Sequence, residues 1–404
     1  MKKTLFTLFF LITISLIAIL FFNVSSFKRY DICIVFTESG GDTIKNLPFL
    51  KTAMNEVLSE CEGTPVLIES GSIFQTKENL VFYENGTKGV SPAVKFLENN
   101  SYDFTAFTPM ALQISPERLK SELKNTDIKI LTVNADVLNT DGLFDLNGVT
   151  LFFASYISDK GSRYLDADTR KKWNVEPPFV IEEHTRLKTE KSVGADMKIA
   201  VFSEYDDIPF LQDDFSEAMV YFHNVMPSLN IFVTDSKDFT EKMNLRESLV
   251  VKTTSKVPSI IVAEYSLILN EDKRSVATVK KDIKTLSLNR FKADGETEKL
   301  IEPYIVRYND HMNKESDQVP YEINCKHPGK EECLMDRLYS IALKEAASEC
   351  SSGVDFTISF PVSNDVSIER GKSITRKYIG TLFPLKEKSV VLNLIWEQIT
   401  EITV

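Results

Sequence analysis

The chain has 404 residues and a formal net charge of −11, with 43% hydrophobic and 26% charged residues. At ~150 residues per domain this length predicts two domains, and the acidic balance disfavours nucleic acid and anionic membrane surfaces as partners. With 15 glycines, where an average chain has about 7%, the sequence contains no glycine-rich phosphate loop.

The N-terminus, residues 1–26, has the pattern of a secretory signal or a signal anchor. Two lysines precede an uncharged, largely apolar run of 19 residues, 4–22. At ~1.5 Å per residue this run is just long enough to cross a bilayer core of ~30 Å. Val24 and Ser26, however, fit the small-residue positions of a cleavage site. Cleavage and retention both stay open, and either way we expect the remaining chain to be secreted or held outside the cytosol by the uncleaved leader.

Five cysteines are typical of that oxidising compartment. Cys33 lies inside an apolar strand pattern, and we interpret it as a buried thiol. Cys325 and Cys333 flank the turn-like "KHPGKEE" and indicate a local disulfide. The pairing of Cys61 and Cys350 stays open, as does that of Cys33 if it is bridged after all.

After residue 26, two Asn-x-Ser/Thr triplets begin at Asn85 and Asn99. Such triplets are acceptors for N-linked glycans in a eukaryotic host. Chance triplets are common, so both residues are candidates only.

Residues 28–270 alternate short apolar runs with amphipathic ones, which is the pattern of an α/β domain. The predicted strands cover 32–36, 65–70, 102–107, 128–137, 148–156, 197–205, 229–235, 247–254 and 258–269. The predicted helices cover 46–61, 91–99, 115–123 and 214–225. Ser115 is the expected N-cap of the third helix, because Pro116 follows it in the first turn.

A linker is predicted over 271–320, because residues 296–314 combine helical periodicity with high charge. A second α/β unit is predicted over 321–404, with a helix at 331–350 and strands at 354–360 and 388–395. No internal repeat or low-complexity segment is present.

These elements resemble, in order and motif, the 5′-nucleotidases, which are two-domain calcineurin-like metallophosphoesterases. "CKHPGKEECLMDRLYSIALKEA" resembles the ecto-enzyme pattern C-R-x-x-E-C-x-x-G-N-L-x-x-D-A. In the N-terminal half, "ICIVFTESGG" resembles I-L-H-T-N-D-x-H-G, "VLIESGSIFQT" resembles l-D-x-G-D-x-F-Q-G, and "YDFTAFTPMAL" matches the segment ending in G-N-H-E-F. "KIAVFSEYDD" and "LNIFVTDSKDF" match the two later histidine motifs. The resemblance implies a layered β-sandwich flanked by helices, followed by a shortened C-terminal α/β domain.

In that family, two divalent metals are held by Asp, His and Asn side chains at the strand ends and activate water for phosphoester hydrolysis. The positions that match these functional residues carry Ser39, Gly41, Ser72, Pro109, Met110, Glu204, Ser236 and Asp238. Glycine, proline and methionine do not ligate hard divalent ions, and hydroxyls do so poorly. Only Glu204 and Asp238 keep the capacity to bind a metal, and the nucleotide-stacking motif is lost as well, with Leu385 and Glu387 in place of phenylalanine and asparagine.

Other candidate sites in the sequence have simpler explanations. The acidic residues Asp206, Asp207, Asp213 and Asp214 could bind calcium, but a solvated loop and helix start explains them better. Ser72 as a nucleophile is disfavoured, because no histidine lies near it in sequence. The four histidines show no metal spacing. Tyr205 and Phe239 are the best candidates for a remodelled ligand surface.

The sequence therefore predicts a secreted or membrane-tethered, catalytically inactive 5′-nucleotidase-like protein that needs no cofactor. Its expected partner is an unknown protein or small-molecule ligand, not nucleic acid, with membrane contact only through an uncleaved leader. The alternative is a weak metal-dependent phosphoesterase with a relocated site at Glu204 and Asp238. A third possibility is an unrelated receptor ectodomain with a similar fold.

Overall fold

The computed structural model describes residues 27–39, 43–109, 111–130, 132, 135, 142–157, 167–175, 194–203, 229–234, 242–245, 248–252, 257–270, 276–318, 323–325, 366–368 and 373–375. It divides the chain into two compact units, Met1–Ile305 and Val306–Val404. Each unit is considered by itself below.

The first unit contains a five-stranded sheet in the order β11-β10-β1-β2-β3. Its strands are β1 (Phe27–Glu38), β2 (Thr64–Glu69), β3 (Phe104–Thr105), β10 (Ser259–Asn270) and β11 (Val276–Ser287). β1, β2 and β3 run parallel, whereas β10 pairs antiparallel with both β1 and β11. The carboxyl ends of β1, β2 and β3 therefore meet at one edge of the sheet.

A six-stranded sheet in the order β4-β5-β6-β7-β9-β8 forms the second layer of this unit. Its strands are β4 (Leu143–Leu146), β5 (Val149–Ile157), β6 (Met197–Ser203), β7 (Leu229–Thr234), β8 (Lys242–Leu245) and β9 (Ser248–Lys252). The four central strands are parallel, and the two edge strands pair antiparallel.

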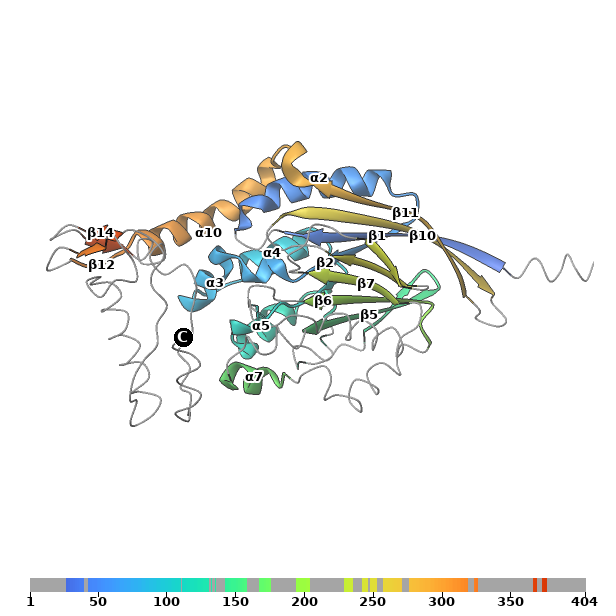
Figure 1. The fold of residues 1–404 in the computed structure, drawn as a ribbon, viewed down its shortest axis with the longest axis horizontal. Coiled ribbons are helices and arrows are strands. Elements are labelled where there is room, and N and C mark those ends of the chain that lie inside the picture. The colour runs from blue at the N-terminus through green and yellow to red at the C-terminus, as the bar shows by residue number, and fades with distance from the viewer. Residues whose placement is uncertain are drawn as a thin grey trace, which may run out of the picture. The chain divides into compact units, whose positions relative to one another are not determined.

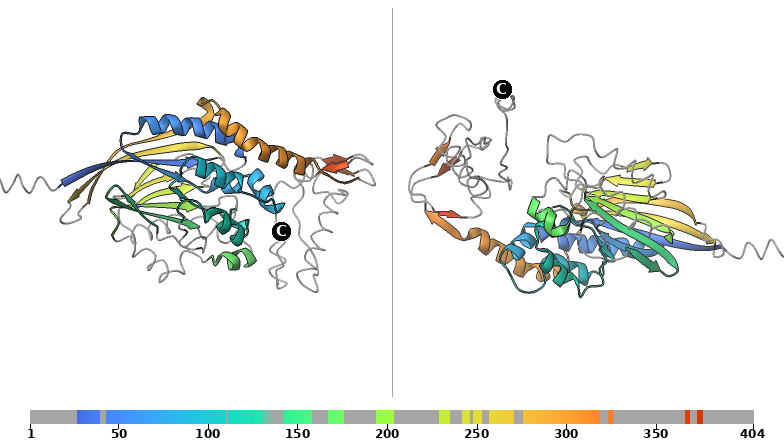
Figure 2. Two further views of the ribbon diagram at one scale, coloured as in Figure 1. Left: turned by 180° about the vertical axis from the view of Figure 1, so that it is seen from behind. Right: turned by 90° about the horizontal axis from the view of Figure 1, so that it is seen from below.

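The two sheets pack face to face, and Figures 1 and 2 show the two layers from several sides. Ile32, Ile34 and Phe36 of β1 lie in one core cluster with Phe153 and Ile199 of the second sheet. Because successive strand side chains point to opposite faces, the intervening residues of β1 join a second core cluster with the helices. The predicted α/β class and the layered sandwich flanked by helices are confirmed.

Helices cover the outer face of the five-stranded sheet, with α2 against β10 and β1 (Figure 1). The described helices are η1 (Ile44–Asn46), α2 (Leu47–Glu60), η2 (Ser72–Gln75), α3 (Lys77–Glu84), α4 (Pro92–Asn99), η3 (Ala111–Gln113), α5 (Pro116–Leu123), α7 (Ala167–Trp173), η6 (Leu288–Arg290) and α10 (Gly295–Asn313). Ser115 caps α5 as predicted, because its side chain accepts a hydrogen bond from the Arg118 N–H. Ser91 caps α4 in the same way.

The interpretation of Cys33 as a buried thiol was wrong, because Cys33 forms a disulfide with Cys61. Cys33 belongs to the set of β1 side chains that faces the helices. Cys61 directly follows α2, which packs on that face. The bridge therefore ties the middle of β1 to the end of the helix that covers it.

Residues 276–287, which the sequence analysis assigned to a linker, form β11 in the five-stranded sheet instead. Their sequence, VATVKKDIKTLS, is rich in lysine and shows no regular alternation of polar and apolar residues, so a strand is not evident from the pattern. The expected helix at 296–314 is present as α10.

In the second unit, β12 (Glu315–Gln318) pairs with β15 (Ser373–Thr375), and β13 (Ile323–Cys325) pairs with β14 (Val366–Ile368). The helix predicted at 331–350 and the strands at 354–360 and 388–395 lie outside the described residues, as does Cys333, so the Cys325–Cys333 bridge stays a prediction. None of the described helices is long and apolar enough to span a membrane.

Candidate functional site

Polar side chains gather where β1, β2 and β3 end. β1 ends at Glu38 and is followed by Ser39, and β2 ends at Glu69 and is followed by the turn that leads into η2. We call Glu38, Ser39, Glu69, Ser70, Ser72 and Thr105 the serine–glutamate cluster. All six residues have no solvent exposure. This is the edge of the sheet where the sequence resemblance places the family's metal ligands.

The hydroxyl groups of the cluster hydrogen-bond to one another. The Oγ atoms of Ser39 and Ser72 lie 2.8 Å apart, and those of Ser70 and Ser72 lie 2.9 Å apart. Ser70 Oγ also lies 3.0 Å from Glu38 Oε1. The Ser70 hydroxyl is the donor toward Ser72 Oγ and Glu38 Oε1, and the Ser72 hydroxyl is the donor toward Glu69 Oε1 at 3.2 Å. Every serine hydroxyl therefore has a partner inside the cluster. The two serines that the sequence resemblance aligns with aspartates are thus bonded to each other.

Glu69 is held by backbone and side-chain donors. Its Oε2 accepts from Gly71 N at 2.6 Å and from Thr105 Oγ1 at 3.2 Å, and its Oε1 accepts from Ile73 N at 3.2 Å. Burial, and secondarily the nearby Glu38 carboxylate, raise the pKa of Glu69 to about 8. Glu69 is therefore mainly protonated at neutral pH.

Gly71 makes the sharp turn between Glu69 and Ser72 possible. Its φ of 95° lies in the left-handed region, and a Cβ at this position would lie 2.6 Å from the backbone oxygen of Ala106. The matching glycine of the D-x-G-D motif is therefore kept for a steric reason. Ser72 stands at the position that the resemblance aligns with the second aspartate of that motif.

The described residues at this edge do not fit a two-metal centre. They offer neutral hydroxyls, which ligate hard divalent ions poorly, and two carboxyl groups, of which Glu69 is protonated near neutral pH. Each serine hydroxyl is already hydrogen-bonded inside the cluster. Within the described part of the chain, no group of three or more His, Cys, Asp or Glu side chains could hold a metal ion.

The other predicted site positions are only partly described. Pro109 is buried and lies just after β3, where its carbonyl accepts a hydrogen bond from Leu112 N. Five further positions lie outside the described residues: Gly41, Met110, Glu204, Ser236 and Asp238. Tyr205, Phe239 and the acidic residues weighed for calcium lie outside them as well.

The sequence analysis did not identify Glu38, Glu69, Ser70 or Thr105 as members of a site. A signal was present, since Glu38, Glu69 and Thr105 are the polar last residues of their strands and Ser70 follows β2 directly. From sequence alone, however, these residues are ordinary strand ends. They form a cluster only because the fold brings together segments more than 30 residues apart.

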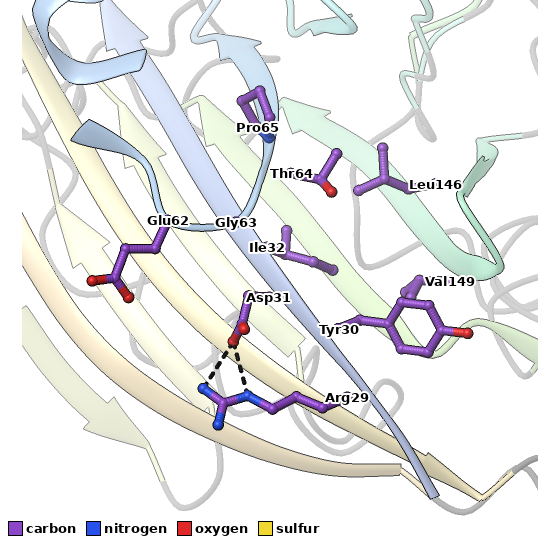
Figure 3. Close-up of a pocket in the computed structure, with 10 residues that line it drawn as sticks. All are labelled: Arg29, Tyr30, Asp31, Ile32, Glu62, Gly63, Thr64, Pro65, Leu146 and Val149. Carbon is purple, nitrogen blue, oxygen red and sulfur yellow. Dashed lines mark hydrogen bonds and ion pairs between the residues drawn. The ribbon is translucent and has the colours of Figure 1, made fainter. Parts of the chain in front are cut away.

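A pocket lies at the opposite, amino-terminal ends of β1 and β2 (Figure 3). Its cavity of about 470 Å³ is within the range of small-molecule sites. We call it the amino-end pocket, and it is lined by Arg29, Tyr30, Asp31, Ile32, Glu62, Gly63, Thr64, Pro65, Leu146 and Val149. An exposed ion pair joins Arg29 to Asp31 at 3.2 Å, and Ser266 accepts a hydrogen bond from the same guanidinium. From Ile32 to Ser39 the strand covers roughly 23 Å at ~3.3 Å per residue, so the pocket and the serine–glutamate cluster are separate sites.

Solved structures share this fold. One match is a protein from Staphylococcus aureus that is described as a 5′-nucleotidase and was solved with α-ketoglutarate. It covers 88% of this chain and 72% of its own, with a TM-score of 0.56 at 13% identity. The calcineurin-like phosphoesterase YfkN from Bacillus subtilis matches over 71% of this chain and 100% of its own, with a TM-score of 0.53 at 14% identity. No protein-family model and no curated protein sequence matches the chain. The predicted resemblance to 5′-nucleotidases and calcineurin-like phosphoesterases is thus confirmed at the level of fold.

Proposed function

We propose that this protein is a catalytically inactive relative of the 5′-nucleotidases that works by binding a partner. The observation that carries this proposal is the direct hydrogen bond between Ser39 and Ser72, at two positions where the family has metal-binding aspartates. Both side chains are fully buried, and the adjacent Glu69 is protonated near neutral pH. A phosphoesterase of this class needs anionic and imidazole ligands to generate hydroxide, and these residues supply a closed hydroxyl network instead.

The partner in this proposal meets the protein outside the cytosol. The apolar leader and the Cys33–Cys61 disulfide support export, since structural disulfides form and persist in oxidising compartments. The net charge of −11 disfavours nucleic acid as the partner. The amino-end pocket is the first place to look for a small-molecule ligand, because its volume suits one and it lies away from the serine–glutamate cluster.

The test is a metal and activity assay on the purified, exported protein. Metal content is measured by mass spectrometry, and hydrolysis of AMP is assayed with added zinc, manganese or calcium. We expect no stoichiometric metal and no turnover above a heat-inactivated control.

Two variants identify the source of any turnover. Activity that disappears in the Glu204→Ala, Asp238→Ala double variant but survives in Ser39→Ala would establish the relocated metal site and overturn the proposal. Activity lost in Ser39→Ala alone would locate the chemistry in the serine–glutamate cluster and overturn it equally.

A further inference from the structure

The turn that follows α3 presents Asn85 to solvent on a fixed backbone. Asn85 is exposed, and its N–H donates to Val81 O at 3.1 Å at the end of the helix. Gly86 follows with a φ of 59°, a left-handed conformation that commonly ends helices. Arg118 donates a hydrogen bond to the Thr87 carbonyl and thereby holds the turn. The side chain of Asn85 forms no hydrogen bond with any residue that the structure describes.

Asn99 and Asn100 are neighbours with opposite roles. Asn100 is buried, and its Nδ2 donates to Phe96 O at 2.7 Å. Asn99, the last residue of α4, is exposed, and no described residue hydrogen-bonds to its side chain. Ser101, two positions on, is also exposed and has a φ of 51°. Asn99 and Ser101, which carry the amide and the hydroxyl of the triplet, are therefore both exposed. Asn100, between them, stabilises the end of α4.

We propose that Asn85 and Asn99 each carry an N-linked glycan. Each begins an Asn-x-Ser/Thr triplet in which x is not proline, and at both positions the side-chain amide is not needed for a described contact. The inference rests on the exported location in the proposed function, because glycan transfer takes place in the secretory pathway.

The modification is a group transfer from a lipid-linked oligosaccharyl diphosphate. The asparagine Nδ2 forms a bond to the anomeric carbon of the first sugar, while the bond from that carbon to the diphosphate oxygen breaks. The lipid diphosphate leaves with the electron pair of the broken bond, and the amide loses one proton. No oxidant or reductant is required.

The experiment expresses the full chain with its own leader in insect cells and maps glycopeptides by mass spectrometry. An N-glycosidase in ¹⁸O-water converts each glycosylated asparagine to a heavy aspartate, which identifies the residue. Site mapping is needed because a third triplet, Asn23–Ser25, lies in the leader. We expect label at Asn85 and at Asn99.

Matched variants test whether the triplets are responsible. Thr87→Ala should remove the label at Asn85 only, Ser101→Ala should remove it at Asn99 only, and Thr87→Ser should retain it. A double Asn85→Gln, Asn99→Gln variant should still be secreted. Asn100→Ala should lower the melting temperature, because it leaves Phe96 O without its side-chain partner.

Failure of this inference and failure of export give different results. An exported chain that contains the Cys33–Cys61 disulfide but has unlabelled Asn85 and Asn99 would overturn the glycan assignment alone. A chain that stays in the cytosol with free Cys33 and Cys61 thiols would contradict the export part of the proposed function. A second chain, with residues 1–26 replaced by an insect leader, then tests the two asparagines directly, and lack of label there overturns the inference.

Discussion

The two ends of the β1–β2 pair differ in how their polar groups are arranged. At the carboxyl ends, the serine–glutamate cluster is fully buried, and its groups hydrogen-bond mainly to one another. At the amino ends, the amino-end pocket is open, and its Arg29–Asp31 pair is partly exposed, with 58% and 33% of the two side chains accessible. The same two strands thus end in a sealed polar interior on one side and a solvated charged surface on the other.

The difference follows from the charge of the groups that each end buries. Metal ligands buried at strand ends would be repelling carboxylates if the ions were absent. Uncharged hydroxyls and a protonated Glu69 keep the same edge packed without that repulsion. The amino-end pocket has no such constraint, since water solvates its charges.

The largest expected effect comes from restoring a family aspartate with Ser72→Asp. This change places a third carboxyl group in the buried cluster. Position 72 contacts Glu69 directly and is connected to Glu38 through Ser70. An uncompensated buried charge costs about 3–5 kcal/mol, so the free energy of unfolding should fall by about that amount. Urea denaturation at neutral pH measures it.

Ser72→Ala is the matched control for that experiment. It removes the acceptor of Ser39 N–H without adding charge, so the expected loss is smaller, about 1–3 kcal/mol. If added manganese restored the stability of Ser72→Asp, the carboxyl ends of the strands would still be able to bind a cation. The proposed difference between the two strand ends would then be wrong.

The next effect is a dependence of stability on pH through Glu69. Its pKa is raised from 4.5 to about 8 in the folded protein, so between these values the folded state holds a proton that the unfolded state has released. The contribution of Glu69 to the free energy of unfolding is therefore fully present below pH 4.5. It falls by about 1.4 kcal/mol per pH unit as the pH rises to about 8. Urea unfolding of wild type and Glu69→Gln at pH 5, 6 and 7 measures the difference in slope.

Glu69→Gln should lose this slope even though it is less stable at low pH. Gly71 N and Ile73 N each need an acceptor, and an amide supplies only one oxygen. Glu98→Gln, at an exposed position on α4, controls for the loss of one carboxyl group. Equal slopes for wild type and Glu69→Gln would mean that Glu69 is ionised in the fold.

The smallest effect is expected at the amino-end pocket. Arg29→Ala breaks an exposed ion pair with Asp31, and such pairs contribute about 0.2–1 kcal/mol. The change in unfolding free energy should stay within that range and should shrink further in high salt. A loss above 2 kcal/mol would show that this end is as tightly constrained as the serine–glutamate cluster, and Asp31→Ala provides the reciprocal measurement.

Local patterns were sufficient to predict many elements. β1, β2, α4 and α5 follow from apolar periodicity and from caps such as Ser115, since both act within a few residues. The motif resemblance alone aligns Ser39 and Ser72 with aspartates of the 5′-nucleotidases. β11 was missed because its lysine-rich sequence lacks the alternation of polar and apolar residues that marks a strand, and only its pairing with β10 identifies it.

By itself, the sequence determined the α/β pattern, the apolar run at residues 4–22 and the hydroxyl side chains at positions 39 and 72. Only the tertiary structure decided that Cys33 pairs with Cys61, that Ser39 meets Ser72, and that Glu69 is buried enough to stay protonated. The physical reason is that propensity and periodicity act between neighbours in sequence. Disulfides, hydrogen bonds between strand ends and desolvation depend on which distant segments the fold brings together.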